Sequence, residues 1–224
     1  RQNAAPMSKP NLQSKLPDIG TTIFTVMSEL AREAGALNLS QGFPDFDGPA
    51  ALLAGVEHYL NSGHNQYAPM MGVPALREAI AGKVADLYGA RLDPATEITV
   101  TSGATEALFC AIAAVVNPGD EVIVPAVTFA ATANCVVYQG GRPVFADVHP
   151  NTLLINPADV EKKITARTKA VIAVDYAGQP CEYDRLNEIA QNHGLMLIAD
   201  ACHALGAQYK DRPVGSLADI TVFS

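Results

Sequence analysis

The chain has 224 residues, of which 49% are hydrophobic and 17% charged, so it is long enough for one globular α/β domain with or without a small appendage. Its formal net charge of -8 argues against nucleic acid or an acidic membrane as the main partner, because no cluster of Lys and Arg outweighs the acidic background. Backbone amides could still bind a small ligand that carries a phosphate.

The four cysteines, Cys110, Cys135, Cys181 and Cys202, form no CxxC pair and have no metal-ligand spacing. We therefore expect free, buried thiols, no metal site and a reducing, cytoplasmic location. No segment reaches the length of a transmembrane helix, and the first residues lack an apolar leader.

The first 96 residues divide into an arm and a helical segment. Residues 1–20 carry Pro6, Pro10 and Pro17 and few periodic apolar positions, which indicates an extended N-terminal arm. Residues 21–96 are expected to form a helical N-terminal segment. Thr21 and Thr22 can cap its first helix, and further helices are expected over 49–61 and over 74–88, where Gly89 follows the last one.

From residue 97 to residue 224 the pattern alternates between strands and helices. Strands are expected at 98–101, 121–125, 143–148, 170–175, 195–200 and 220–223. Helices are expected at about 105–116, 128–138, 157–164 and 183–193, the third capped by Asn156 and the fourth ended by Gly194. Such alternation predicts an α/β domain with a mostly parallel sheet wrapped by helices through right-handed crossovers.

The stretch from Leu195 to Gly206 places one carboxylate and one imidazole after an apolar run. A strand that is buried on both faces reads as such a run, and ligands bind at the carboxyl ends of parallel strands. Asp200 and His203 are therefore candidate site residues at the edge of the sheet. The alternative, an Asp that only caps the following turn, is equally compatible with this stretch alone.

Two further turns at the same edge carry small or aromatic residues. The turn at 101–105 opens directly into a helix, so its amides and the Thr105 hydroxyl could bind a phosphate, although any short strand-to-helix turn favours small residues. Phe129 could lie flat on a planar ring, and a core aromatic is the alternative. Ser224 follows the last strand. A phosphate site, a ring-stacking aromatic, a carboxylate and a hydroxyl together suit pyridoxal 5'-phosphate (PLP).

The two parts of the chain resemble two different families. Residues 15–116, with NLSQGFPDFDGP (38–49), NQYAPMMGVPALREAI (65–80) and TSGATEAL (101–108), resemble class I aminotransferases of the methionine/kynurenine type. Residues 117–224, with NPGDEVIVPAVTFAATAN (117–134), TKAVIAVDYAGQPCEYDRL (168–186) and LIADACHALGAQYKDRPVGSLADITVFS (197–224), resemble DegT/StrS sugar-nucleotide aminotransferases. Both families have the fold type I PLP-transferase architecture, so the resemblance implies a chimera joined near 116–120, with a large domain incomplete at its C-terminus.

The resemblance also implies a role for each candidate. Gly103, Ala104, Thr105 and Ser224 would bind the cofactor phosphate, Phe129 would stack on its ring, Asp200 would pair with the ring nitrogen, and His203 would lie near the phenolic oxygen. Tyr67 resembles a tyrosine that reaches a phosphate across a homodimer interface, and Gly42 a glycine beside the substrate. By themselves, these two positions are also consistent with a packing residue and a plain turn glycine.

The sequence departs from these families in two places. Residues 176–180 (YAGQP) replace the Asn-Pro element that follows the fourth strand in class I enzymes. The Schiff-base lysine implied by the second family would lie about five residues beyond Ser224, and no lysine of the chain matches it, so no catalytic residue is assigned. The expected function is amino transfer between an amino acid and a keto acid or keto-sugar nucleotide, with residues 1–224 expected to be inactive alone. The alternative is a non-catalytic fold type I fragment or scaffold module.

Overall fold

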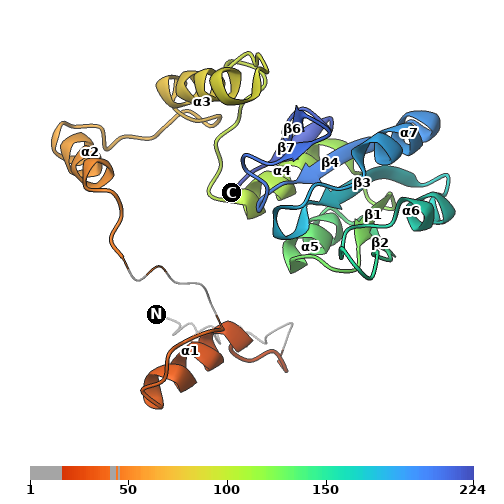
Figure 1. The fold of residues 1–224 in the computed structure, drawn as a ribbon, viewed down its shortest axis with the longest axis horizontal. Helices are drawn as coiled ribbons and strands as arrows, with labels where there is room; N and C mark the ends of the chain where they lie inside the picture. Colours follow the sequence, from red (N-terminus) through yellow and green to blue (C-terminus); the bar gives the residue numbers. More distant parts are fainter. Residues whose placement is uncertain (1–16, 41–43, 45) are drawn as a thin grey trace, which may run out of the picture. The chain divides into compact units, whose positions relative to one another are not determined.

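The computed structural model describes residues 17–40, 44 and 46–224 and contains two compact units, residues 1–66 and 67–224 (Figure 1). Gly42 lies outside the described residues. No helix among those described is both long and apolar enough to cross a bilayer.

The described residues of the first unit form two helices, α1 (Ile23–Glu33) and α2 (Ala50–Asn61). The predicted cap of α1 is confirmed, because the Thr22 hydroxyl accepts the Thr25 N–H at 3.4 Å. Neither helix buries a residue, and Ile23 and Leu30 are 64% and 54% exposed. The described residues of this unit therefore form no hydrophobic core of their own. These helices lack the packing of an apolar face that supplies most of a helix's stability in proteins.

The second unit is built around a five-stranded parallel sheet with the strand order β2-β1-β3-β4-β7. Its strands are β1 (Glu121–Pro125), β2 (Arg142–Ala146), β3 (Thr168–Val174), β4 (Met196–Asp200) and β7 (Ile220–Val222). The helices of this unit are α3 (Pro74–Tyr88), α4 (Ala104–Val115), α5 (Ala130–Tyr138), α6 (Pro157–Lys163) and α7 (Tyr183–His193), with a short 3₁₀ turn, η1 (Tyr176–Gly178). The predicted α/β class and parallel sheet are confirmed.

Both faces of the sheet are covered, which explains why its central strands are apolar throughout. Ile123 of β1 and Leu197 of β4 pack in a cluster with α6 and α7 residues such as Val160 and Leu186. The alternating positions of the same strands, such as Val122 and Ile198, pack instead against α4 and α5. The residues of these two helices in that cluster are Ala111, Ile112, Cys135 and Val136. The period of two along each strand therefore decides which helical layer a side chain meets.

Helix ends follow the sequence signals closely. The Asn156 side chain accepts the Ala158 N–H at 3.0 Å at the start of α6. Gly89 and Gly194 end α3 and α7 with φ of +66° and +64°, the left-handed conformation that glycine adopts without steric cost. The predicted bounds of α3 and α7 are confirmed.

The expected strand at 98–101 is wrong. These residues are not in a strand, and the sheet of the described residues ends at β7 on one side and β2 on the other. The Val100 N–H donates to the Met71 carbonyl at 3.1 Å, and Gly72, with φ of +98°, lies against the Val100 side chain. A short apolar run becomes a strand only when a neighbouring strand completes its hydrogen bonds, and here a loop carbonyl takes that place.

The chain between β4 and β7 contains a small hairpin of β5 (Gln208–Tyr209) and β6 (Arg212–Pro213) rather than a helix. Lys210 and Asp211 at its turn both have positive φ, as a two-residue hairpin turn requires. This hairpin was not among the predicted elements.

The four cysteines are free, but they are not all buried as expected. Cys135 and Cys181 are buried and Cys202 is half-buried, whereas Cys110 is exposed on α4. Cys110 falls on the face of α4 opposite to Ile112, which points into the core, so helical periodicity places it outside.

A buried carboxylate holds together the amino-terminal edge of the sheet. Glu121 begins β1 and is 2% exposed. Its Oε1 accepts a hydrogen bond from Nη2 of Arg167 at 2.6 Å, and its Oε2 accepts one from the Thr165 hydroxyl at 2.6 Å. The Thr165 hydrogen bond and then Arg167 lower the pKa of Glu121 below its ordinary value of 4.5.

We expect Glu121→Gln to destabilise the fold by about 1–3 kcal/mol, because a charge-assisted hydrogen bond at a buried position is replaced by a neutral one. Urea unfolding followed by circular dichroism measures this. Glu188→Gln is the matched control: Glu188 is exposed and pairs with Arg185 at 2.6 Å in solvent, so its loss should change the free energy of unfolding much less than Glu121→Gln does. Equal effects of the two substitutions would contradict the structural role of Glu121.

The same pair predicts a pH dependence. Because the folded-state pKa of Glu121 is lowered, its stabilising contribution is present above the ordinary carboxyl value of 4.5 and is lost as the pH falls through the lowered pKa. The stability difference between wild type and Glu121→Gln should therefore shrink as the pH is lowered from neutrality to well below 4.5. A difference that stays constant over this range would show that the Glu121 charge is not involved.

Candidate active site

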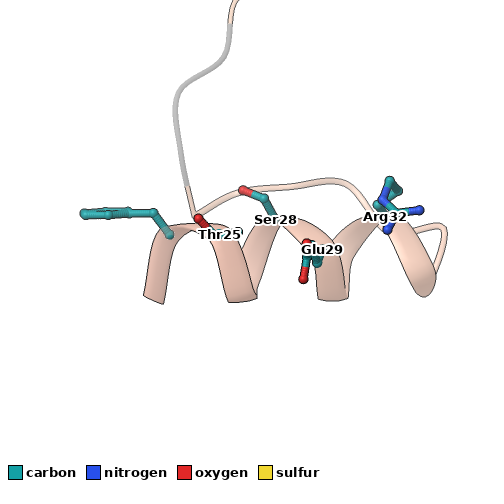
Figure 2. A pocket seen from close by; sticks show the side chains of 5 residues that line it. Thr25, Ser28, Glu29 and Arg32 are labelled. Carbon is teal, nitrogen blue, oxygen red and sulfur yellow. The ribbon is translucent and has the colours of Figure 1, made fainter. Parts of the chain in front are cut away.

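A shallow hollow of about 320 Å³ lies along α1 in the first unit (Figure 2). It is lined by Phe24, Thr25, Ser28, Glu29 and Arg32. All five belong to α1, and Figure 2 shows Thr25, Ser28, Glu29 and Arg32 spread along the helix. None of the predicted site residues is among them, so this hollow is not the candidate site.

A larger cavity of about 590 Å³ lies between α4 and α5 in the second unit. From the turn before α4 and from α4 itself it is lined by Ser102, Thr105, Glu106 and Phe109, and from α5 and the residue before it by Phe129, Ala130, Ala131, Asn134, Cys135 and Tyr138. The fold therefore brings together the predicted phosphate turn and Phe129, which is 64% exposed rather than a core aromatic.

The turn before α4 leaves backbone donors open. Gly103 precedes the helix with φ of +85°, and its N–H donates to the Thr101 carbonyl at 2.9 Å. Among the described residues, nothing accepts the N–H groups of Ala104 and Thr105, which lie at the positive end of the helix dipole. The carboxylate of Glu106 accepts the Ser102 N–H, so that amide is already occupied. Two amides and the exposed Thr105 hydroxyl remain for an anion.

Asp200 ends β4 and points toward the α4 and α5 layer, because it shares the strand face of Ile198. It is 6% exposed. Its Oδ2 lies 3.5 Å from the Thr132 hydroxyl of α5, which is 2.7 Å from the Thr128 hydroxyl, and its Oδ1 accepts the Cys202 N–H at 3.3 Å. No ion pair joins Asp200 to a Lys or Arg in the part of the chain that the structure describes.

The thiols beside Asp200 are protonated donors rather than nucleophiles. Burial, followed by the hydrogen bond to Asp200, raises the pKa of Cys202 to about 12. Burial likewise raises the pKa of Cys135 to about 11. A carboxylate that is almost buried and has no cationic neighbour is costly unless a cationic group compensates it, so Asp200 is suited to a cationic partner.

His203 is exposed and lies against η1. Its Nδ1 accepts the Ala177 N–H at 3.3 Å, and its ring meets that of Tyr176 edge-on at 6.3 Å between centroids. Asp175, which precedes η1, is fully buried and accepts the Cys181 N–H at 2.8 Å and the Tyr183 hydroxyl at 2.9 Å. Burial raises the pKa of Asp175.

Three residues of this neighbourhood were missed from the sequence: Thr132, Asp175 and Ala177. Thr132 lies one helical turn after Phe129, so the face of α5 that carries the aromatic could have suggested it. Asp175 ends an apolar strand in the same way as Asp200 does, so the same signal identifies it. No sequence signal singles out the amide of Ala177.

Of the predicted site residues, only Thr105 and Phe129 line this cavity; Gly103, Ala104, Asp200, His203, Tyr67 and Ser224 are not among its lining residues. Tyr67 is fully exposed, and the cavity lining does not include it. Ser224 is exposed and follows β7, whose Val222 pairs with Asp200. Among the described residues, no group of three or more His, Cys, Asp or Glu is placed to hold a metal ion.

Comparison with known proteins shows two kinds of relative. Methionine aminotransferase of Escherichia coli K12 is 49% identical over 194 residues, which are 84% of this chain and 50% of that protein. The spore coat polysaccharide biosynthesis protein SpsC of Bacillus subtilis is 46% identical over 131 residues, 58% of this chain and 34% of that protein. The chain thus spans half or less of the length of these curated relatives.

The fold is also that of solved aminotransferases. The PLP form of a protein described as a sugar aminotransferase, from Streptococcus pneumoniae, superposes with a TM-score of 0.68 at 31% identity, over 82% of this chain and 48% of that one. The parallel sheet between two helical layers is therefore the fold type I PLP-transferase architecture. The sequence profile of the DegT/DnrJ/EryC1/StrS aminotransferase family matches residues 80–224, and the chain belongs to this family.

Proposed function

We propose that the protein to which this chain belongs is a PLP-dependent aminotransferase. It transfers an amino group between an amino acid and a keto acid or keto-sugar nucleotide. The observation that carries the proposal is Asp200, an almost buried carboxylate without a cationic partner at the carboxyl edge of the sheet. Residues 97–224 form the PLP-binding domain in this proposal, and 1–20 and 21–96 form the arm and the helical segment.

Asp200 would accept a hydrogen bond from the protonated ring nitrogen of the cofactor. That contact supplies the positive charge that the buried carboxylate lacks, and the carboxylate in turn keeps the nitrogen protonated. A protonated pyridine ring acts as the electron sink on which amino-group transfer depends. The Thr132 hydroxyl, 3.5 Å from Oδ2, limits the positions that the carboxylate can take.

The phosphate would bind at the start of α4. The open amides of Ala104 and Thr105, the Thr105 hydroxyl and the positive end of the helix dipole suit a dianion. Gly103 supplies the positive φ that turns the chain into the helix, and Ser224 adds a hydroxyl from the end of β7. The Glu106 carboxylate, which accepts the Ser102 N–H, would repel the anion and lower its affinity for this site.

The ring would lie against Phe129, whose exposed face borders the same cavity as Thr105. His203 would lie near the phenolic oxygen of the ring. Two further assignments rest on resemblance alone: Tyr67 as a phosphate ligand across a dimer interface, and Gly42 beside the substrate. No lysine of residues 1–224 matches the Schiff-base position, so these residues alone are proposed to bind PLP without a covalent bond and without turnover.

The finer proposals concern assembly, location and origin. A homodimer is supported by exposed apolar side chains on α4 and α5, among them Phe109, Val137 and Tyr138. The cytoplasm is supported by the four free cysteines. A chimera joined near 116–120 is supported by the two kinds of relative that the chain matches.

We expect Asp200→Asn to weaken PLP binding by about 10- to 100-fold, the equivalent of one charge-assisted hydrogen bond of about 1.5–3 kcal/mol. Equilibrium dialysis with PLP, read by its absorbance, measures the affinity. Asp219→Asn is the matched control, because Asp219 is an exposed carboxylate that accepts the Leu197 N–H at the opposite end of β4. Equal PLP affinity of wild type and Asp200→Asn would overturn the proposed site.

Borohydride reduction tests the absence of a covalent anchor. The chain of residues 1–224, loaded with PLP, freed of excess cofactor and treated with borohydride, should carry only substoichiometric adducts spread over its accessible lysines, because no single lysine is placed to anchor the cofactor. A lysine variant is not needed: mass spectrometry of the intact chain and of its peptides is the readout. A stoichiometric adduct at one lysine would contradict the assignment and identify the residue that anchors the cofactor.

A further inference from the structure

We propose that η1 is a positioning turn for His203: the Ala177 amide fixes His203 as the tautomer protonated on Nε2, and Asp175 holds the turn in place. This inference rests on the proposed function for its consequence, since a neutral imidazole of this kind offers one defined donor, Nε2–H, to an acceptor on the cofactor. The arrangement itself is a property of the chain alone.

The hydrogen bond to Ala177 determines the tautomer. A backbone N–H can only donate, so the Nδ1 atom 3.3 Å away must accept with its lone pair. In a neutral imidazole the proton must then reside on Nε2. No hydrogen bond of the described residues involves Nε2, so this donor is free for a ligand.

The turn is shaped to fit His203. Ala177 has φ of +54° and ψ of 24°, a left-handed conformation that non-glycine residues rarely adopt. Gly178 has φ of +83°, and a Cβ there would lie 3.0 Å from the carbonyl oxygen of His203. The turn therefore contacts His203 at its side chain and at its backbone, and it is held in an unfavourable conformation to do so.

Hydrogen bonds of Asp175 stabilise this conformation of the turn. Its carboxylate accepts the Cys181 N–H and the Tyr183 hydroxyl, both on the far side of the turn. Its carbonyl accepts the Gly178 N–H at 3.1 Å, and its own N–H donates to the Asp200 carbonyl at 3.0 Å. The residue thus connects both ends of the turn to β4, the strand that carries Asp200.

Tyr183 makes the anchor rigid. Its side chain is fully buried at the start of α7, and its ring packs edge-on against that of Tyr209 at 6.0 Å between centroids. The hydroxyl has no access to water, so Asp175 is its acceptor. Since both partners are buried, removal of the hydroxyl should loosen the turn without opening the core.

The test is nuclear magnetic resonance of the cofactor-free chain labelled with ¹⁵N-histidine, at a pH near 8 where a histidine of ordinary pKa, about 6.5, is neutral. Long-range proton–nitrogen correlations distinguish the two tautomers of each of the five histidines, and His203→Gln assigns the signal of interest. We expect a pyridine-like Nδ1 and a pyrrole-like Nε2 for His203. A His203 protonated on Nδ1 overturns the proposal.

Gly178→Ala should move the turn away from His203 and shift its signals toward a mixture of tautomers. Gly206→Ala is the matched control, because Gly206 has φ of +88° and nothing within 4 Å of an added Cβ. It should leave the His203 tautomer unchanged. Equal spectra for the two variants and wild type would overturn the role of η1.

Tyr183→Phe carries the test if Gly178→Ala does not fold. We expect the Ala177 amide to exchange with solvent at least 10-fold faster in Tyr183→Phe, and at the wild-type rate in Tyr138→Phe, whose side chain is exposed. An unchanged exchange rate in Tyr183→Phe would overturn the role of Asp175. Failure of PLP binding with an intact Nε2–H tautomer would overturn the proposed function and not this inference.

Discussion

The parallel pairing of β3 with β4 is the constraint on which the site depends. Val174 pairs with Asp200, and the Asp175 N–H donates to the Asp200 carbonyl, so two carboxylates meet at the same edge of the sheet. The strand pleat sends their side chains to opposite layers, because successive residues along a strand face opposite sides. One pair of strands therefore places an anchor on one side and a candidate ligand group on the other.

The two carboxylates accept hydrogen bonds from different sets of donors. This difference indicates a structural role for Asp175 and a ligand-binding role for Asp200. Asp175 receives two strong donors from its own chain, the Cys181 amide and the Tyr183 hydroxyl. Asp200 receives a weaker set, with the Cys202 amide at 3.3 Å and the Thr132 hydroxyl at 3.5 Å. Burial penalises both, but only Asp200 is left with capacity for a cationic partner. Asp200 is thus suited to binding a ligand, and Asp175 to stabilising the turn.

The matches to a methionine aminotransferase and to a polysaccharide biosynthesis protein are compatible with one fold. The solved aminotransferases share with this chain a buried parallel sheet, which follows from covering both faces of parallel strands with helices. The shared core explains why two families can resemble parts of one chain without a break in the strand pattern.

The sequence by itself determined the elements whose signals are local. The caps at Thr22 and Asn156, the glycines at 89 and 194, and the apolar runs of β1, β3 and β4 gave the parallel sheet and its helices, and Asp200 was identified as the end of a buried strand. The tertiary structure alone decided what depends on distant partners. It showed that 98–101 bonds to a loop carbonyl rather than a strand, that Thr132 reaches Asp200 from 68 positions away, and that the Ala177 amide meets His203. Hydrogen bonds between distant segments leave no periodic trace in a sequence, because either partner alone has many other uses.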